Sequence, residues 1–158
     1  MNKNKYKILV TGASGFVGIA LIKELLSLDF LVIGLVRKKT NIFKSALYSE
    51  ILIDDIKSYI DHINIKKIDI IIHLAAIAHT QNKNYKDYEN TNVKGTENIM
   101  DLANRCSVKL IIMLSSIKVN GEGFNSNNKK YNEECKPKPI DFYGKSKLAS
   151  EKILIKSC

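Results

Sequence analysis

The sequence predicts an α/β fold built around a doubly wound parallel sheet. Short apolar segments of strand length alternate along the chain with segments whose apolar residues recur at helical spacing. The first apolar segment, 6–10, leads into a helical segment, 19–28, through a turn that contains three glycines. Parallel strands need helical crossovers between them, and this alternation provides them.

The other expected strands are four apolar segments, at 31–36, 49–53, 68–74 and 109–114. The segment 68–74 is a nearly continuous apolar run interrupted by Asp69, which is typical of a central strand buried on both faces. Apolar periodicity also predicts one long helix over 85–106 and a final helix over 143–156. Between them, the polar segment 117–139 predicts a long loop.

The glycine turn, residues 11–18, reads Thr11-Gly12-Ala13-Ser14-Gly15-Phe16-Val17-Gly18. Its G-x-x-G-x-x-G spacing differs from the G-x-G-x-x-G of the standard dinucleotide fingerprint. Gly12 would let the chain turn sharply, Gly15 would let the backbone approach a pyrophosphate, and Gly18 would let the helix pack close to the strand. The helix N-terminus would then offer N–H groups to the phosphates. The residues predicted here to bind a dinucleotide are Gly12, Ser14, Gly15, Phe16, Val17 and Gly18.

Composition narrows the class of protein. The 158 residues suit one domain, and 45% hydrophobic with 26% charged residues is typical of a globular protein. The net charge is +9, but the lysines are spread along the chain, so we expect a basic surface and no nucleic-acid partner. No apolar run approaches a membrane span, and the short polar N-terminus is no signal peptide. Three scattered cysteines suggest reduced thiols in a cytoplasmic protein, and no spacing indicates a metal site.

The end of the second expected strand indicates which dinucleotide would bind. An acidic residue at this point would bond the ribose 2′-OH of NAD, but this chain has Arg37 followed by Lys38. A guanidinium suits a 2′-phosphate, so the sequence favours NADP over NAD. The alternative is a basic loop in a lysine-rich protein.

The next two strand ends would complete the cofactor site. Asp55 could accept from the adenine amino group while Ile56 packs on the ring, although Asp55 could equally be a helix N-cap. After the strand 68–74, the run Leu74-Ala75-Ala76 would leave room for the cofactor. His73 is expected to be a structural hydrogen-bonding residue. Asn92, on the long helix and facing the strand 68–74, could tie the backbone near the nicotinamide.

Tyr143 and Lys147 carry the expected chemistry. At i and i+4 of a helix they lie on one face, so the ammonium would stabilise a phenolate that exchanges a proton with a sugar or alcohol oxygen. Lys147 would also bond the nicotinamide ribose. Ser116, at a strand end, would hold the reacting oxygen.

These motifs together resemble a known family. TGASGFVG, HLAA, NVKGT, LSSIKVNG and YGKSK follow in the order of the extended short-chain dehydrogenases/reductases, from Ile8 to Ile153. The stretches SSIKVNGEG and FYGKSKLASEKIL look like those of bacterial UDP-sugar 4-epimerases and 4-keto-reductases of polysaccharide synthesis. The resemblance implies a Rossmann-like sheet of strand order 3-2-1-4-5. It implies Ser116, Tyr143 and Lys147 as the catalytic residues, with Asn92, Tyr143 and Lys147 also near the cofactor.

The resemblance also implies what the complete protein would do. It would transfer hydride at a sugar carbon, C4 of a UDP-hexose, as an epimerase or, as Arg37 favours, an NADPH-dependent reductase. Residues 1–158 would be the dinucleotide-binding domain, a C-terminal substrate domain would follow, and the full-length protein would be a homodimer. The alternative is a non-catalytic dinucleotide-binding or redox-sensing module, against which the intact Ser116, Tyr143 and Lys147 argue. Lys118 would contact a substrate phosphate or be solvated, and the strand 109–114 would leave an apolar edge prone to self-association.

Overall fold

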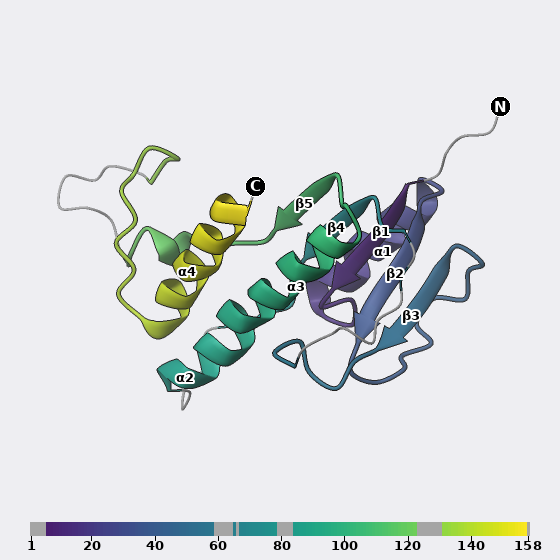
Figure 1. Ribbon diagram of the computed structural model, residues 1–158, viewed down its shortest axis with the longest axis horizontal. Helices are drawn as coiled ribbons and strands as arrows, with labels where there is room; N and C mark the ends of the chain where they lie inside the picture. The colour runs from purple at the N-terminus through teal and green to yellow at the C-terminus, as the bar shows by residue number, and fades with distance from the viewer. Residues whose placement is uncertain (1–5, 59–64, 66, 79–83, 123–130, 158) are drawn as a thin grey trace.

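A five-stranded parallel sheet forms the centre of the computed structural model, which describes residues 6–58, 65, 67–78, 84–122 and 131–157. Its strands are β1 (Lys7–Thr11), β2 (Leu31–Val36), β3 (Tyr48–Leu52), β4 (Ile70–His73) and β5 (Leu110–Met113). They lie in the order β3-β2-β1-β4-β5, and every neighbouring pair is parallel (Figure 1). The expected doubly wound sheet and its strand order are confirmed.

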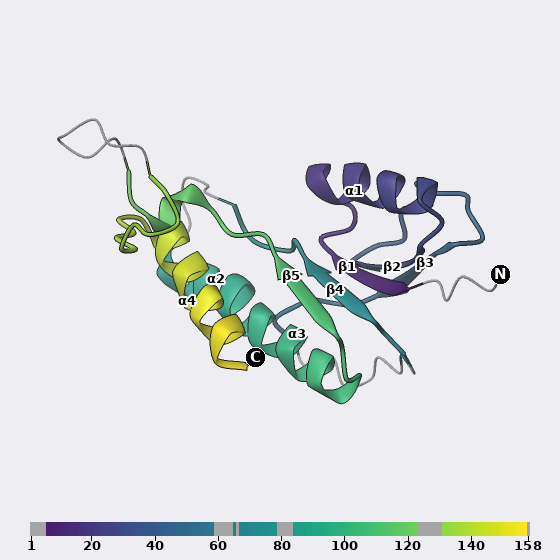
Figure 2. The ribbon, with the colours of Figure 1, turned by 90° about the horizontal axis from the view of Figure 1, so that it is seen from above.

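Helices cover both faces of this sheet, as Figure 2 shows. α1 (Phe16–Ser27) lies on one face, and α3 (Lys94–Arg105) and α4 (Phe142–Ser157) lie on the other. Alternate residues of a strand point to opposite faces, so β1 supplies Val10 to the core on the α1 side and Leu9 to the core on the α3 side. Burial on both faces explains why the central strands read as apolar runs.

Asp69 interrupts the apolar run before β4 for a structural reason. Its carboxylate accepts a hydrogen bond of 2.9 Å from the Lys7 backbone N–H and lies 3.6 Å from the Lys109 ammonium. The residue therefore connects the starts of β1, β4 and β5. β4 begins at Ile70, directly after Asp69 and two residues later than the apolar run predicts.

The expectation of one continuous helix over 85–106 is wrong. The chain forms α2 (Tyr85–Tyr88), then a π-helical turn, η1 (Glu89–Val93), and then α3. A capping box between Asn84 and Asp87 begins α2. The π-turn contains Asn92, whose side chain and carbonyl both bond to other segments, and π-turns are frequent at functional sites.

The edge strand β5 exposes apolar side chains. Ile111 packs against the core on the α3 side, whereas Leu110, Ile112 and Leu114 are each about half exposed. α1 packs chiefly against β1 and β2. The self-association expected for this edge stays a prediction.

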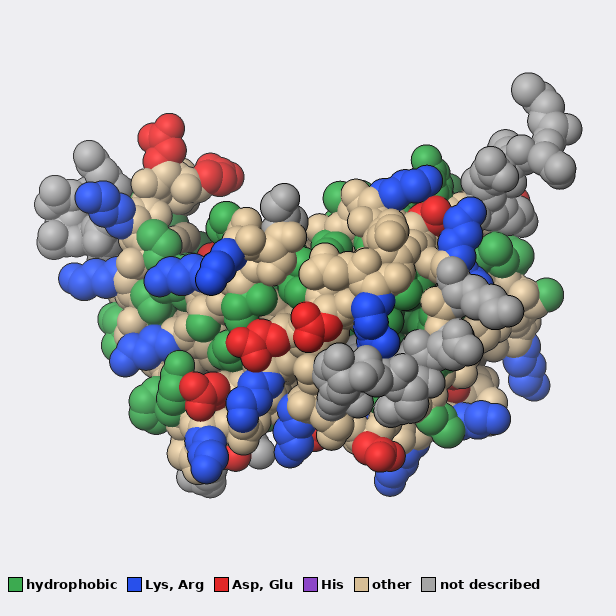
Figure 3. Space-filling view, viewed as in Figure 1, with side chains coloured by type: hydrophobic (Ala, Val, Ile, Leu, Met, Phe, Trp, Pro, Cys, Tyr) green, Lys and Arg blue, Asp and Glu red, His purple; other side chains and the backbone are tan. Residues whose placement is uncertain are grey.

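The Lys and Arg side chains on the surface viewed in Figure 3 are scattered rather than gathered into one patch. In the described part of the chain, no helix is both long and apolar enough to cross a membrane, and no cluster of side chains could hold a metal ion. Cys106 and Cys135 are free thiols, as expected, and Cys158 lies outside the described residues.

Gly18 provides a test of how closely α1 packs on the glycine turn. A Cβ at this position would lie 2.3 Å from the Gly12 carbonyl oxygen, so we expect Gly18→Ala to lower the free energy of unfolding by about 1–3 kcal/mol. Gly15→Ala is the matched control, because its Cβ would lie 3.2 Å from the same oxygen, and it should cost clearly less. Urea denaturation measures both variants, and a Gly18→Ala protein as stable as wild type would contradict this packing.

Candidate functional site

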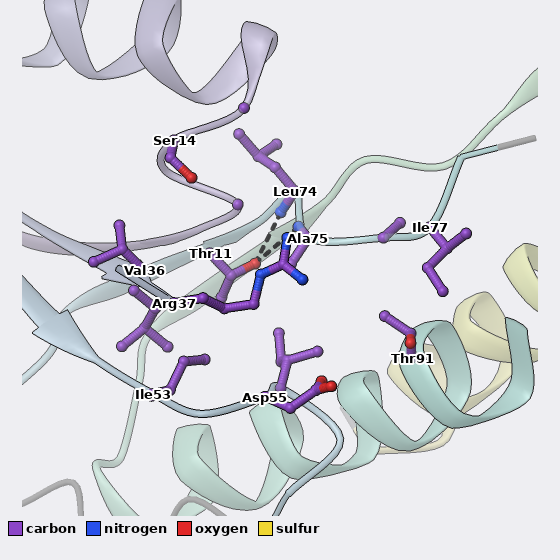
Figure 4. Close-up of a pocket in the computed structure, with 15 residues that line it drawn as sticks. Thr11, Ser14, Val36, Arg37, Ile53, Asp55, Leu74, Ala75, Ile77 and Thr91 are labelled. Carbon is purple, nitrogen blue, oxygen red and sulfur yellow. Dashed lines mark hydrogen bonds between the residues drawn. The ribbon is translucent and has the colours of Figure 1, made fainter. Parts of the chain in front are cut away.

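A cavity of about 380 Å³, here called the main cavity, lies at the carboxyl ends of the central strands. Most of the residues that the sequence predicts to bind a dinucleotide line it (Figure 4): Gly12, Ser14, Gly15, Arg37, Asp55, Ile56, Leu74, Ala75 and Ala76. The cavity also has lining residues that the sequence does not single out: Thr11, Leu35, Val36, Ile53, Ile77 and Thr91. Most of these are strand-end side chains, and nothing in the sequence distinguishes them from core residues.

The glycine turn forms one wall of the main cavity. Gly12 has a φ of +67°, and a Cβ there would lie 2.9 Å from the Ala75 backbone nitrogen, so the turn approaches the chain after β4 closely. Gly15 is the N-cap of α1, and the first turn of that helix has neither a side-chain cap nor an acidic residue. The positive end of the helix dipole is therefore available to an anion.

Phe16, Val17 and Gly18 do not line the main cavity. The Phe16 side chain is 93% exposed, Val17 is also exposed, and Gly18 packs against the turn. Their contribution to an anion site would come from the backbone of the first helical turn rather than from side chains.

Asp55 and Ile56 form the opposite wall. The Asp55 carboxylate accepts a 3.1 Å hydrogen bond from the Lys57 backbone N–H, so it closes a local turn while also facing the cavity. Asn98 on α3 fixes this segment by donating to the Ile56 carbonyl at 2.8 Å and to the Ser58 carbonyl at 3.1 Å. The role of Asn98 has no signal in the sequence, because its partners lie about 40 residues away.

The basic loop, residues 37–39, borders the main cavity through Arg37. It also lines a second, open cavity of about 600 Å³ with Ser14, Thr40 and Asp54. Within the described residues, no carboxylate pairs with these three cations. Glu50 on β3 instead accepts from the Thr40 backbone N–H at 2.9 Å, from the Thr40 hydroxyl and from the Tyr48 hydroxyl. Burial opposes the charge of Glu50, but the hydrogen bonds from Thr40, Tyr48 and Asn41 together outweigh it and hold its pKa below the usual range.

A buried polar network begins where β1 and β4 end. The Thr11 hydroxyl oxygen accepts from the backbone N–H groups of Leu74 and Ala75, at 3.1 and 3.0 Å, and lies 2.7 Å from His73 Nδ1. His73 Nε2 lies 3.3 Å from the Thr96 hydroxyl. Burial, together with the Lys147 charge, lowers the pKa of His73 to about 3. His73 is therefore a structural hydrogen-bonding residue, as the sequence predicts.

The network continues through Asn92 to α4. The Asn92 amide accepts from the Ile77 N–H at 2.8 Å, and donates to the Ile77 carbonyl at 3.2 Å and to the Ser146 hydroxyl at 2.9 Å. The Asn92 carbonyl accepts from Thr96 at 2.6 Å and from Ser150 at 2.9 Å. Asn92 thus ties a backbone segment, the one that follows β4, and also holds α4.

Tyr143 and Lys147 lie on α4 beyond this network, and neither lines the main cavity. Lys147 is 3% exposed, and burial lowers the pKa of its ammonium, an effect that nearby Glu151 partly offsets. The Ser115 hydroxyl bonds the Glu151 carboxylate and so connects the end of β5 to α4, a contact that sequence reasoning missed.

Ser116 and Lys118 lie on the segment after β5. Ser116 is the N-cap of the 3-10 turn η2 (Ile117–Val119), and its hydroxyl oxygen accepts from the Lys118 N–H at 3.2 Å, which leaves its proton to donate elsewhere. The Lys118 ammonium pairs with Glu122, and with Asp141 at 3.5 Å. Lys118 is therefore an ion-paired residue beside the start of α4, not simply a solvated one.

The main cavity fits a dinucleotide. It combines an uncapped helix N-terminus at a glycine without a side chain, apolar walls from Ile53 and Ile56, and polar groups at Arg37 and Asp55. It lies at the point where the strand order reverses, between β1 and β4, which is where doubly wound sheets bind their ligands. Fold and cavity together define the class: a nucleotide-binding α/β domain.

Comparison with known proteins identifies the family within this class. The chain belongs to the NAD dependent epimerase/dehydratase family, whose sequence model matches residues 8–158. It is 36% identical to a UDP-glucose 4-epimerase of Vibrio cholerae, over 94% of this chain and 46% of the relative. It is 26% identical to a decarboxylating sterol-4-alpha-carboxylate 3-dehydrogenase of Saccharomyces cerevisiae, over 95% of this chain and 46% of that enzyme.

A solved structure agrees with the fold. MoeE5 in complex with UDP-glucose and NAD superposes with a TM-score of 0.82 at 27% identity, over 96% of this chain and 48% of that one. The chain therefore spans about half the length of the proteins that it resembles. These relatives bind or transform different substrates on one fold, so the family alone leaves the reaction of this chain open.

The buried state of His73 predicts a pH dependence of stability. The pKa of His73 is about 3 in the folded protein and about 6.5 in the unfolded chain, so between these values the unfolded chain binds the extra proton. As the pH falls from 6 to 4, wild type should lose stability relative to His73→Gln by about 1.4 kcal/mol per pH unit. Urea denaturation across this range measures the difference, which should be constant above pH 7.5. If the unfolding free energies of the two proteins differed by the same amount at every pH, the pKa of His73 would be unchanged by folding.

Proposed function

We propose that this chain is the dinucleotide-binding domain of an NAD(P)-dependent nucleotide-sugar enzyme that transfers hydride at a sugar carbon, namely C4 of a UDP-hexose. The observation that carries the proposal is the polar network, which joins the backbone lining the main cavity to the helix that bears Tyr143 and Lys147. The identity to a UDP-glucose 4-epimerase and the fold shared with a UDP-glucose complex support the choice of substrate.

The lining of the main cavity suggests which residues would hold each part of the dinucleotide. The backbone at Gly12 and Gly15 and the N-terminus of α1 would bind the pyrophosphate. Asp55 and Ile56 would contact the adenine, and Ala75 and Ala76 would leave room for the nicotinamide half. The bound dinucleotide would supply the group that accepts and returns the hydride.

The residues beyond the cavity would handle the proton. Tyr143 would take the proton of the sugar hydroxyl as the carbon loses hydride, and would return it when the carbonyl is reduced. Lys147 would stabilise the phenolate and bond the nicotinamide ribose. Ser116, whose hydroxyl proton has no partner among the described hydrogen bonds, would donate to the reacting oxygen.

Two versions of this reaction differ in how they use the cofactor. An epimerase oxidises the sugar, presents its other face and reduces it again, so its cofactor is retained. A 4-keto-reductase consumes NADPH in each turnover. The similarity to an epimerase favours the first version, whereas Arg37 favours the second. A measurement of the affinities for NAD and NADP would distinguish them.

Gly15 tests the site assignment. Gly15→Val places a branched side chain where the pyrophosphate would lie, and we expect at least a tenfold loss of NADH or NADPH affinity by calorimetry, about 1.4 kcal/mol. Leu28→Ala is the control, because it removes a 67% exposed side chain at the other end of α1 and should leave the affinity within about twofold. Unchanged affinity in Gly15→Val would show that the cofactor binds elsewhere.

Arg37 tests the cofactor preference. Arg37→Asp removes a partner for the 2′-phosphate and adds an acceptor for the ribose 2′-OH, so NADP affinity should fall about 10- to 100-fold while NAD affinity rises. Lys152→Glu makes the same change in net charge at an exposed position on α4 and should alter neither affinity appreciably. Equal NADP affinity before and after the Arg37 change would exclude Arg37 as the determinant.

A further inference from the structure

We propose that His73 is a positioning residue: a neutral imidazole with its proton on Nε2 that couples the wall of the main cavity to the attachment of α4. The coupling follows from the polar network alone. Its consequence for catalysis rests on the proposed function, because His73 would act through Tyr143 and Lys147 rather than on a substrate.

The surroundings of Thr11 fix the protonation of His73 Nδ1. A hydroxyl oxygen offers two lone pairs, and that of Thr11 accepts from the backbone N–H groups of Leu74 and Ala75. The Thr11 proton must therefore be donated, and His73 Nδ1 lies 2.7 Å away. Nδ1 consequently accepts this hydrogen bond and carries no proton.

The surroundings of Thr96 fix the other ring nitrogen. The Thr96 hydroxyl donates to the Asn92 carbonyl at 2.6 Å, so its oxygen is free to accept from His73 Nε2 at 3.3 Å. Nε2 therefore carries the proton. The opposite tautomer would direct an N–H at the filled lone pairs of Thr11 and leave Nε2 without a donor.

An imidazolium is excluded for the same reason, since it would also place a proton on Nδ1. Bulk water cannot replace the missing partners, because Thr11, His73 and Thr96 are all at most 2% exposed. The charged residue whose field acts on the ring is Lys147 on α4, a cation, which further disfavours protonation. The two threonines that bond the ring, from β1 and α3, carry no charge.

The two ends of this series of hydrogen bonds reach the two halves of the candidate site. At one end, Thr11 holds the N–H groups of Leu74 and Ala75, both of which line the main cavity. At the other end, the Asn92 carbonyl that accepts from Thr96 also accepts from Ser150 on α4. A change in the position of the strand end is thereby passed through His73 to the helix that carries Tyr143 and Lys147.

The protonation state is tested directly by nitrogen-15 NMR of the wild-type chain. Long-range correlations from the ring protons should show the Nε2–H tautomer of His73, unchanged between pH 5 and pH 9. An Nδ1–H tautomer, or a ring that titrates in this range, would overturn the proposal. This measurement needs no cofactor, so its outcome is independent of the proposed function.

The coupling is tested by a pair of variants at Thr96, which lies outside the main cavity. Thr96→Val removes the hydroxyl at nearly constant volume, and Thr96→Ser keeps it. Thr96→Val should shift the amide signals of Leu74 and Ala75 as well as those of α4 near Ser150, and should weaken dinucleotide binding about threefold to tenfold, the equivalent of one hydrogen bond. Thr96→Ser should restore both.

The Thr96 variants distinguish a failure of the coupling through His73 from a failure of the proposed function. Amide shifts confined to α3, with affinity unchanged, would overturn the coupling. If the wild-type chain binds neither NAD nor NADP, the proposed function fails, while shifts at both ends of the network would still support His73 as the connecting residue. If Thr96→Val does not fold, the tautomer measurement on wild type decides the proposal.

Discussion

The candidate site depends on the hydrogen bonds that the Thr11 hydroxyl accepts from the backbone N–H groups of Leu74 and Ala75. They join the carboxyl ends of β1 and β4, the two strands between which the strand order reverses. Gly12 allows this approach, because any side chain there would collide with the Ala75 backbone. Burying a polar group without a hydrogen-bond partner costs free energy. The series of hydrogen bonds from Thr11 through His73 and Thr96 to Asn92 therefore favours one arrangement of these segments.

The π-turn η1 has a clear place in this arrangement. It presents the Asn92 side chain to Ile77 and Ser146 and the Asn92 carbonyl to Ser150, so one residue holds both the chain after β4 and α4. The main cavity and the helix with Tyr143 and Lys147 are thus parts of one bonded unit. Such rigid support is what a site for hydride and proton transfer would need.

The sequence predicts the sheet and the glycine turn well, because apolar runs and glycine spacing report local constraints. The Asn92 bond to the chain after β4 was also predictable, since a polar residue on an apolar helix face needs a buried partner. The sequence does not predict the π-turn, the hydrogen bond between Ser115 and Glu151, or the contacts of Asn98. Each depends on a partner distant in sequence or on a backbone irregularity, and neither leaves a periodic pattern.

Native-state hydrogen exchange of the backbone amides of Leu74, Ala75 and Ile77 tests this account most directly. Leu74 and Ala75 donate to Thr11, and Ile77 donates to Asn92, so the three amides report on the two ends of the network. If the network is one unit, all three should exchange only through the same opening, with a free energy close to that of global unfolding. An Ile77 amide that exchanges through a separate, much cheaper opening would show that the Asn92 contact opens independently of the Thr11 contacts.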